Sequence, residues 1–334
     1  MNQTRFQQIA RRFSELKLLV IGDLILDEFI WGKVRRISPE APVPVVEVNR
    51  ETYYPGGAAN VARNLREFAD QIHLMGLIGC GPHAARLKGL LETDRIRLDC
   101  LLSDPNYTTI VKTRIIAHHQ QMVRVDRETK RGLTPAQVQE ALQRLDTLID
   151  GIDGIIIEDY GKGLLTQELV DAVIARARAA GKIVTVDPNP CNDFVWNDVS
   201  TIKPNRSEAF ATAGKLYSEP VDPPTRDAAL LEVGETLMNR WATESLLVTL
   251  GEQGIMLFHR DNPPFHIPTQ AREVFDVSGA GDTVIALFTL SLCAGATAAE
   301  AAEIANCASG IVVGKLGTAT VSYEELLACF KADA

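Results

Sequence analysis

The stretch Asp276-Val277-Ser278-Gly279-Ala280-Gly281-Asp282 is followed at once by an apolar run, Thr283-Val284-Ile285-Ala286-Leu287-Phe288. This change of character predicts a helix that begins near the glycines. Glycine lets backbone N–H groups approach a ligand closely, and the amides and dipole of a helix N-terminus favour an anion. Asp282 places a carboxylate in the same anion site. Amides that stabilise a moving phosphoryl group, beside a carboxylate that accepts a hydroxyl proton, suit phosphoryl transfer.

A Gly-Ala-Gly sequence before a helix is often only a tight turn, so this motif also has a purely structural interpretation. The wider pattern Asp-x-x-Gly-Ala-Gly-Asp resembles the second signature of the ribokinase-like (PfkB) family of sugar kinases. The resemblance implies that Asp282 is the catalytic base. It also implies that the amides of Gly279, Ala280 and Gly281 form the anion hole.

Composition restricts the classes of protein to consider. The chain has 334 residues, of which 46% are hydrophobic and 23% charged, as in ordinary globular proteins. A formal net charge of −9 argues against a general binder of nucleic acids or anionic membranes. The first 16 residues contain no apolar leader segment, and the longest uncharged stretch, 283–299, falls short of membrane-spanning length. The six cysteines are scattered without a Cys-x-x-Cys pair, so we expect a cytoplasmic protein.

Short apolar runs alternate with helical patterns along most of the chain. This alternation predicts an α/β fold with a mostly parallel central sheet covered by helices on both faces, and the resemblance implies a ribokinase-like layered arrangement. The expected strands are 17–22, 72–78, 154–157, 183–186 and 246–250. The expected helices are 58–68, 135–149, 166–180, 282–294 and 298–315.

Two segments break this alternation. Residues 39–48 are too rich in proline for a central strand, and residues 108–126 are β-branched with alternating charges. We expect both to form half-exposed antiparallel strands of a small β-sheet lid, inserted at about 33–50 and 107–126. The whole chain, 1–334, is then a single kinase domain. Many relatives carry an additional nucleotidyltransferase domain; we expect none here, so that a separate enzyme attaches the nucleotide.

A sugar site is expected beyond the first strand. The stretch Gly56-Gly57-Ala58-Ala59-Asn60 is either a simple loop before a helix or, as it resembles, the first signature of the same family, in which it lines the sugar site. Asp23 follows the first strand, where ligands of doubly wound folds bind, and its carboxylate can accept hydrogen bonds from sugar hydroxyls. Asp27 is a second candidate that could instead be solvated or structural. The expected substrate residues here are Asp23, Asp27, Gly56, Gly57 and Asn60.

Asn205 and Glu208 lie three residues apart at an expected helix start. The spacing fits an N-cap with a capping-box acid. It also allows both side chains to support a hydrated Mg²⁺ ion through water, because Mg²⁺ takes few protein ligands. The resemblance implies the second role, since sugar kinases of this family carry an Asn-x-x-Glu motif beside the metal and ATP.

Two further segments are candidates for the nucleotide site. The turn containing Thr249, Gly251 and Gly254 could be an ordinary hairpin, but the equivalent turn of the family lies beside the nucleotide. Asn306 lies in a helix of small residues, a composition that close helix packing would also explain. The resemblance implies that these four residues, together with Asn205 and Glu208, bind ATP.

Three motifs, at residues 36–46, 159–163 and 312–321, make the chain resemble one branch of the family in particular. They are similar to the branch of the family that phosphorylates C1 of D-glycero-β-D-manno-heptose 7-phosphate, on the route to ADP-heptose for lipopolysaccharide. The 159–163 motif implies that Asp159 contributes to the substrate site. One departure is Asn189, where this resemblance leads us to expect lysine.

A substrate that already carries a phosphate needs basic side chains. Lys112, Arg114 and Arg124 alternate along the expected lid strands and can therefore share a face. Guanidinium groups suit phosphate oxygens, although a solvated charged face is the alternative. Further basic candidates are Arg35, Arg36 and Lys162.

Other functions are compatible with parts of this sequence. A kinase for ribose, fructose or a fructose-phosphate-like sugar would share the motifs, and a catalytically silent sugar-phosphate sensor would share the fold. A nicotinamide dehydrogenase is disfavoured because the first strand lacks Gly-x-Gly-x-x-Gly. Because projecting β-sheets expose edge strands, we also expect a homodimer that pairs through the lids.

Overall fold

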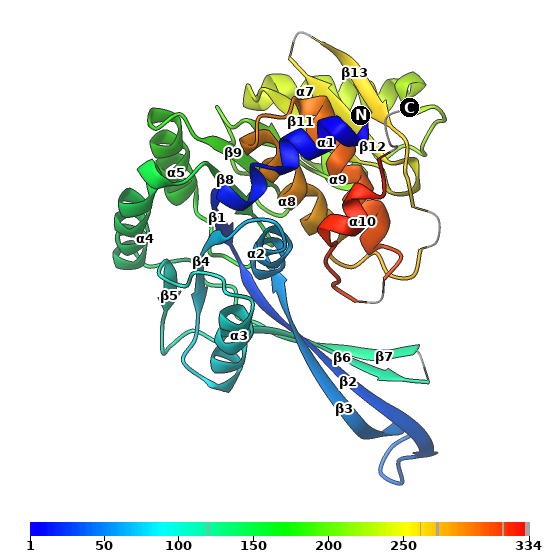
Figure 1. Cartoon of the computed structure of the whole chain (residues 1–334). Helices are drawn as coiled ribbons and strands as arrows, with labels where there is room; N and C mark the ends of the chain where they lie inside the picture. The colour runs from blue at the N-terminus through cyan, green and yellow to red at the C-terminus, as the bar shows by residue number, and fades with distance from the viewer. Residues whose placement is uncertain (119, 261, 272–273, 316, 331–334) are drawn as a thin grey trace.

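The computed structural model describes residues 1–118, 120–260, 262–271, 274–315 and 317–330. His119 of the expected lid and Leu316 of the 312–321 motif lie outside these residues. The described residues form one large layered body and a small sheet that projects from it (Figure 1).

The large body is built on a mixed sheet with the strand order β13-β12-β11-β10-β9-β8-β1-β4-β5 in the described part of the chain. Neighbouring strands are parallel except at β11–β12 and β12–β13. Its central strands are continuous apolar runs, such as Lys17–Gly22, because helices cover both faces. The strands are β1 (Lys17–Gly22), β4 (Gln71–Ile78), β5 (Leu101–Ser103), β8 (Gly154–Glu158), β9 (Ile183–Asp187), β10 (Thr201–Ile202), β11 (Ser245–Thr249), β12 (Ile255–His259) and β13 (Asn262–Ile267).

Two hydrophobic cores lie on opposite faces of this sheet. One core is shared with α1 (Gln3–Ala10), α2 (Ala58–Arg66), α3 (Pro82–Thr93), α8 (Ala280–Cys293), α9 (Ala298–Val312) and α10 (Tyr323–Leu327). The other is shared with α4 (Pro135–Leu148), α5 (Gln167–Ala179), α6 (Arg206–Thr212) and α7 (Ala228–Trp241). Short 3₁₀ turns occupy Phe13–Glu15, Ile149–Gly151, Pro224–Arg226 and Gly251–Gln253. No helix of the described residues is both long and apolar enough to cross a membrane.

The projecting sheet has the strand order β3-β2-β6-β7. Its strands are β2 (Leu24–Ile37), β3 (Pro44–Gly57), β6 (Ile110–Ala117) and β7 (Gln120–Arg127). β2 starts two residues after the end of β1, so the lid is a direct continuation of the first core strand. This continuity places the base of the lid at the carboxyl ends of the core strands.

The expected α/β fold with a small β-sheet lid is confirmed, while some element boundaries differ. The strand expected at 17–22 has those bounds, but the helix expected at 298–315 ends at Val312. The helix expected at 282–294 begins at Ala280, so that Asp282 lies in its first turn. The elements that were not predicted from the sequence are α1, α3, α7, α10, β5, β10 and the β12–β13 hairpin. Of these, α7 had a readable signal, since Leu230, Val233, Leu237 and Trp241 recur at helical spacing and are buried.

Candidate active site

Gly279 sets the start of α8. It is the N-cap residue and has φ 79°, in the left-handed region that favours glycine. A Cβ atom at this position would also lie 2.8 Å from Nδ2 of Asn60. Both the backbone angle and this close approach require glycine here. Because glycine has no side chain, the N-terminus of α8 can lie against α2. The first-turn N–H groups of the helix therefore face the same region as the Asn60 side chain.

Asp282 is buried where three segments meet. Its carboxylate accepts hydrogen bonds from Nδ2 of Asn60 at 2.7 Å and from the hydroxyl of Tyr160 at 2.8 Å. Burial raises its pKa to about 6, against the lowering effect of these two donors. A carboxylate with this pKa is ionised at neutral pH and still has a useful affinity for a proton. Tyr160 was not among the predicted site residues.

A second cluster lies beside Asp282 at the ends of three neighbouring strands. Glu158 ends β8, Asp187 ends β9 and Lys203 follows β10. Nζ of Lys203 is 2.7 Å from Oδ2 of Asp187. Burial, together with the charges of Asp187 and Asp282, raises the pKa of Glu158 well above its usual range. Oε2 of Glu158 has no hydrogen-bond partner among the described residues.

Glu158, Asp187 and Lys203 were not predicted from the sequence to be functional residues. The three residues are far apart along the chain and form no short motif. The available signal was positional, because each is a charged residue at the carboxyl end of a short apolar strand, the edge at which α/β folds bind ligands.

Asp23 is a buried residue whose carboxylate accepts hydrogen bonds from the backbone of the loop after β8. Its carboxylate accepts the N–H groups of Tyr160 at 3.2 Å, Lys162 at 3.0 Å and Leu164 at 3.1 Å. Burial raises its pKa despite these donors. Asp23 therefore fixes the loop that carries Tyr160 to Asp282.

Asp159 stabilises the same loop from its other side. Its carboxylate accepts the N–H of Gly161 at 2.8 Å and Nδ2 of Asn192 at 2.9 Å. Burial raises its pKa as well. The loop after β8 is thus held by two buried carboxyl groups, as expected of a segment that must position a functional side chain.

The two glycines before α2 are required by close contacts. Gly57 has φ 61°, and a Cβ atom there would lie 2.5 Å from the carbonyl oxygen of Asp23. At Gly56 it would lie 2.2 Å from Oδ2 of Asp27. Asn60 then follows in the first turn of α2, where its Oδ1 atom is buried without a hydrogen-bond partner among the described residues. This oxygen is available to a hydroxyl group.

The basic residues of the lid share a face. Asp27 lies opposite Lys112, and Arg114 lies opposite Arg124, across neighbouring strands. Arg114 is paired with Asp27, and Arg124 with Asp126 at 2.9 Å. Nζ of Lys112 is 5.6 Å from the ring centroid of Tyr160, which brings this lysine close to the residues around Asp282. Burial lowers its pKa.

Lys162, also expected to bind the substrate, pairs with Glu128 at 2.7 Å. Most basic side chains named for the sugar phosphate thus already have a carboxylate partner. A phosphate group would have to compete with these carboxylates or share the cation with them.

A pocket of about 430 Å³ adjoins the start of α8. Four of the six residues predicted to bind ATP line it, together with two residues of the glycine motif: Thr249, Gly251, Gly254, Asn306, Ala280 and Gly281. Asn205 and Glu208 are not among its lining residues. The Asn306 amide also donates to the carbonyl of Pro268 at 2.8 Å and so holds one wall. The pocket therefore meets the anion-binding turn at Gly281.

Asn205 and Glu208 form a capping box at the start of α6. The Asn205 side chain accepts from the Glu208 N–H at 3.0 Å, and Oε2 of Glu208 accepts from the Asn205 N–H at 2.8 Å. The Thr249 N–H donates to the Pro204 carbonyl at 3.1 Å, which places this helix start beside the pocket that Thr249 lines. Burial and then the charge of Asp187 raise the pKa of Glu208. Within the described ranges, no three His, Cys, Asp or Glu side chains gather to hold a metal ion.

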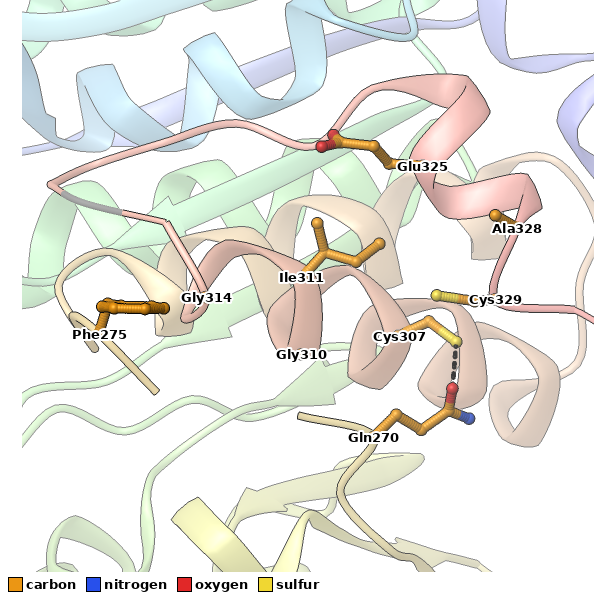
Figure 2. Close-up of a pocket in the computed structure, with 9 residues that line it drawn as sticks. All are labelled: Gln270, Phe275, Cys307, Gly310, Ile311, Gly314, Glu325, Ala328 and Cys329. Carbon is orange, nitrogen blue, oxygen red and sulfur yellow. Dashed lines mark hydrogen bonds between the residues drawn. The ribbon is translucent and has the colours of Figure 1, made fainter. Parts of the chain in front are cut away.

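A second hollow of about 640 Å³ lies between α9 and α10 (Figure 2). It shares Gly310 with the first pocket. Sγ of Cys307 donates to Oε1 of Gln270 at 3.1 Å across its floor (Figure 2). Ala280 and Gly281 of the glycine motif line the first pocket but are not among the residues that line this one.

Comparison with known proteins gives consistent results. The pfkB family carbohydrate kinase pattern matches residues 15–325. The chain is 42% identical over 98% of its length to the bifunctional protein HldE of Syntrophotalea carbinolica and 41% identical over 94% to that of Vibrio cholerae. It spans 65% and 63% of the length of these two relatives.

Solved structures share the fold at low sequence identity. Arabidopsis thaliana ribokinase, complexed with ribose and ATP, aligns with a TM-score of 0.72 at 17% identity, covering 95% of this chain and 99% of its own. Phosphofructokinase-2 from Escherichia coli, with substrates and products, aligns with a TM-score of 0.74 at 18% identity, covering 94% and 99%.

Proposed function

This chain belongs to the pfkB family of carbohydrate kinases, and we propose that it phosphorylates the C1 hydroxyl of D-glycero-β-D-manno-heptose 7-phosphate with ATP. The observation that carries the proposal is the position of Asp282. This buried carboxylate, held by Asn60 and Tyr160, lies in the first turn of α8 beside the nucleotide pocket. A proton acceptor and an anion site are therefore next to each other.

In the proposed reaction the C1 oxygen attacks the γ-phosphorus of ATP. The new O–P bond forms as the bond from the γ-phosphorus to the β–γ bridging oxygen breaks, and ADP leaves. Asp282 accepts the hydroxyl proton, for which its raised pKa is suited. The amides of Gly279, Ala280 and Gly281 stabilise the negative charge of the transferred group.

ATP would occupy the pocket lined by Thr249, Gly251, Gly254 and Asn306, with its triphosphate directed to Gly281. Glu208 fits the water shell of a hydrated Mg²⁺ ion, because its carboxylate lies at the start of α6, close enough to Asp187 for that charge to raise its pKa, and Mg²⁺ takes few protein ligands directly. We propose that Glu208 and Asn205 support this ion through water. When bound, it would neutralise charge on the triphosphate.

The heptose assignment rests on two observations. The motifs at 36–46, 159–163 and 312–321 resemble the heptose branch of the family. The chain is also 42% identical to a bifunctional HldE protein along nearly its whole length. We propose that the sugar binds over Asp23, Gly57 and Asn60.

The substrate phosphate would lie under the lid. Its expected partners are the basic residues of the inner lid face and of the loop after β8: Lys112, Arg114, Arg124 and Lys162. Asp27, Gly56 and Asp159 would hold the site in shape. Closure of the lid would exclude water and so limit hydrolysis of ATP. A reaction that consumes ATP and supplies ADP-heptose synthesis fits a cytoplasmic enzyme.

We further propose that residues 1–334 act as one kinase domain that pairs with a second copy through the lid. β3 and β7 are the edge strands of the lid sheet. Large apolar side chains stand exposed on the lid, among them Ile37, Val48, Val123 and Val125. Exposed apolar edge strands favour pairing with another chain.

A substrate panel tests the proposal. ADP release would be measured with heptose 7-phosphate, fructose 6-phosphate, ribose and fructose at equal concentrations. We expect a strong preference for the heptose. Turnover of another sugar alone would retain the kinase chemistry and reject the heptose assignment. Absence of turnover with every sugar, with ATP still bound, would instead favour a silent sugar-phosphate sensor.

A further inference from the structure

Lys203 is a buried cation at the edge of the proposed phosphoryl-transfer site. Only 4% of the residue is exposed, and it follows the short strand β10. Its N–H donates to the Val186 carbonyl at 2.8 Å, which fixes its backbone next to the end of β9. The side chain then reaches Asp187, with Nζ 2.7 Å from Oδ2. The backbone and the ion pair together determine where the ammonium group lies.

The ammonium group lies against the anion-binding turn of α8. A Cβ atom built on Gly281 would be 3.4 Å from Nζ of Lys203 and 4.0 Å from Oδ2 of Asp187. Gly281 also lines the nucleotide pocket. The lysine is therefore within a short distance of the same amides that would hold the transferred phosphoryl group.

The charge around Lys203 is not balanced by a simple ion pair. Asp187, Glu158 and Glu208 all act on the ammonium group, and Asp282 is affected by it in turn. Burial disfavours the charge of Lys203, but these carboxyl groups outweigh burial and raise its pKa. Lys203 is therefore protonated at neutral pH. A buried charge of this kind is costly unless its hydrogen bonds are made, and an ammonium group has three donors.

We propose that Lys203 is a catalytic residue that donates a hydrogen bond to the phosphoryl group during its transfer, while Asp187 holds the ammonium group in place. This inference rests on the proposed function, because it requires ATP to bind with its triphosphate at Gly281. Lys203 keeps its proton throughout, and Asp282 receives the proton of the sugar hydroxyl. The contribution of Lys203 is the stabilisation of charge on the transferred oxygens.

The test compares nucleotide binding with turnover in the variant Lys203→Met, which keeps an unbranched side chain one atom shorter and removes its charge. If Lys203 contacts the γ-phosphoryl group, K203M should weaken ATP binding by roughly 10-fold while leaving ADP binding unchanged. It should also lower kcat by about 10²-fold. Calorimetry with ATP and with ADP gives the first result, and a coupled assay gives the second.

A matched control is available at Lys215, an exposed lysine paired with Glu232 at 2.6 Å. K215M should leave both binding and kcat unchanged. If K203M fails to fold, the double variant Lys203→Met with Asp187→Asn removes both charges of the pair and carries the same comparison. A purely structural lysine would alter ATP and ADP binding equally, and that result, or an unchanged kcat, would overturn the inference.

The nucleotide comparison contains no sugar. If the wild-type protein phosphorylates a sugar other than the heptose, the proposed substrate is wrong but the ATP–ADP comparison at Lys203 still decides this inference. If the wild-type protein binds neither nucleotide, the proposed function and the inference both fail. The substrate panel and the binding data therefore separate the two failures.

Discussion

Asp282 receives two hydrogen bonds from residues that are distant in the sequence. Asn60 comes from α2 and Tyr160 from the loop after β8, and that loop is itself fixed by Asp23. These contacts determine both the orientation and the pKa of the carboxyl group. At the scale of single residues, the proposed function depends on how that carboxyl group gains and loses a proton.

Replacement of Asp282 by Asn should remove the base while retaining the shape of the side chain. We expect D282N to lower kcat by about 10²-fold or more, because the amide cannot accept the hydroxyl proton. ATP binding and thermal unfolding should be little changed. Asp150 is exposed and serves as the control, so D150N should behave as the wild type. Near wild-type turnover by D282N would exclude Asp282 as the base.

The pH dependence of kcat/KM should follow the ionisation of Asp282. Burial raises its pKa to about 6, so the carboxylate is present above this pH and is lost as the pH falls through it. We expect kcat/KM to fall below about pH 6, approaching a tenfold loss per pH unit.

A substrate phosphate also ionises near pH 6, so a variant must identify the group. Tyr160 donates to Asp282 and lowers its pKa. In Y160F that pKa should rise, and the acidic limb of the profile should move to higher pH. A limb that stays in place would assign the titration to the substrate.

Short motifs allowed part of this site to be predicted from the sequence. Asp282 follows its glycines within a few residues, and so does Asn60, so each of these two motifs can be recognised in the sequence directly. Lys203, Asp187 and Glu158 meet only because three strands end side by side. No local pattern encodes that meeting, which depends on strand order. The ion pairs of Arg114 and Lys162 were equally invisible, because their carboxylate partners come from other segments.

At the scale of elements, α6 combines a structural and a proposed functional role at one point. Its capping box satisfies N–H groups at the helix start, and Glu208 also interacts with Asp187 and Lys203. Glu208 can therefore cap the helix and support a hydrated Mg²⁺ ion from the same position. They can be separated by an exchange that keeps the hydrogen bond and removes the charge.

Glu208→Gln is that exchange, since the amide oxygen can still accept from the Asn205 N–H. We expect E208Q to increase the Mg²⁺ concentration needed for half-maximal activity several-fold, with little change in thermal unfolding. The capping box of α9 offers a matched control, because E300Q makes the same exchange at Thr297–Glu300. An unchanged Mg²⁺ requirement in E208Q would leave Glu208 with the capping role alone.

Elements with a continuous apolar pattern were predicted well, and those with a narrow buried face were not. β1 is buried along nearly its whole length and was placed correctly. α3 buries only Ala84, Leu87 and Leu91, so its pattern is weak. β10 has two residues, too few for any periodicity, although it carries Lys203 into the site.

At the scale of the whole molecule, the lid extends from the first core strand and carries exposed apolar side chains. Val123 and Val125 alternate along the edge strand β7 and therefore share a face. The lid thus has two surfaces, one with paired charges toward the site and one that is more apolar. A lid that also pairs with a second copy would need both surfaces, the charged one for the substrate and the apolar one for the second copy.

We expect the protein to be a dimer in light scattering at micromolar concentration. Lysines on an edge strand prevent pairing, so V123K/V125K should be monomeric with little change in thermal unfolding. L216K is the control, because Leu216 is 95% exposed and lies outside the lid. A monomeric wild-type protein, or a double variant that stays dimeric, would contradict pairing through β7.

The most direct test of the central claim is to identify the product by ³¹P nuclear magnetic resonance after incubation with ATP, Mg²⁺ and D-glycero-β-D-manno-heptose 7-phosphate. The proposed reaction predicts a new phosphate signal coupled to the proton on C1, one equivalent of ADP, and loss of both in D282N. Phosphorylation at another carbon, or no sugar phosphorylation while ATP still binds, would contradict it.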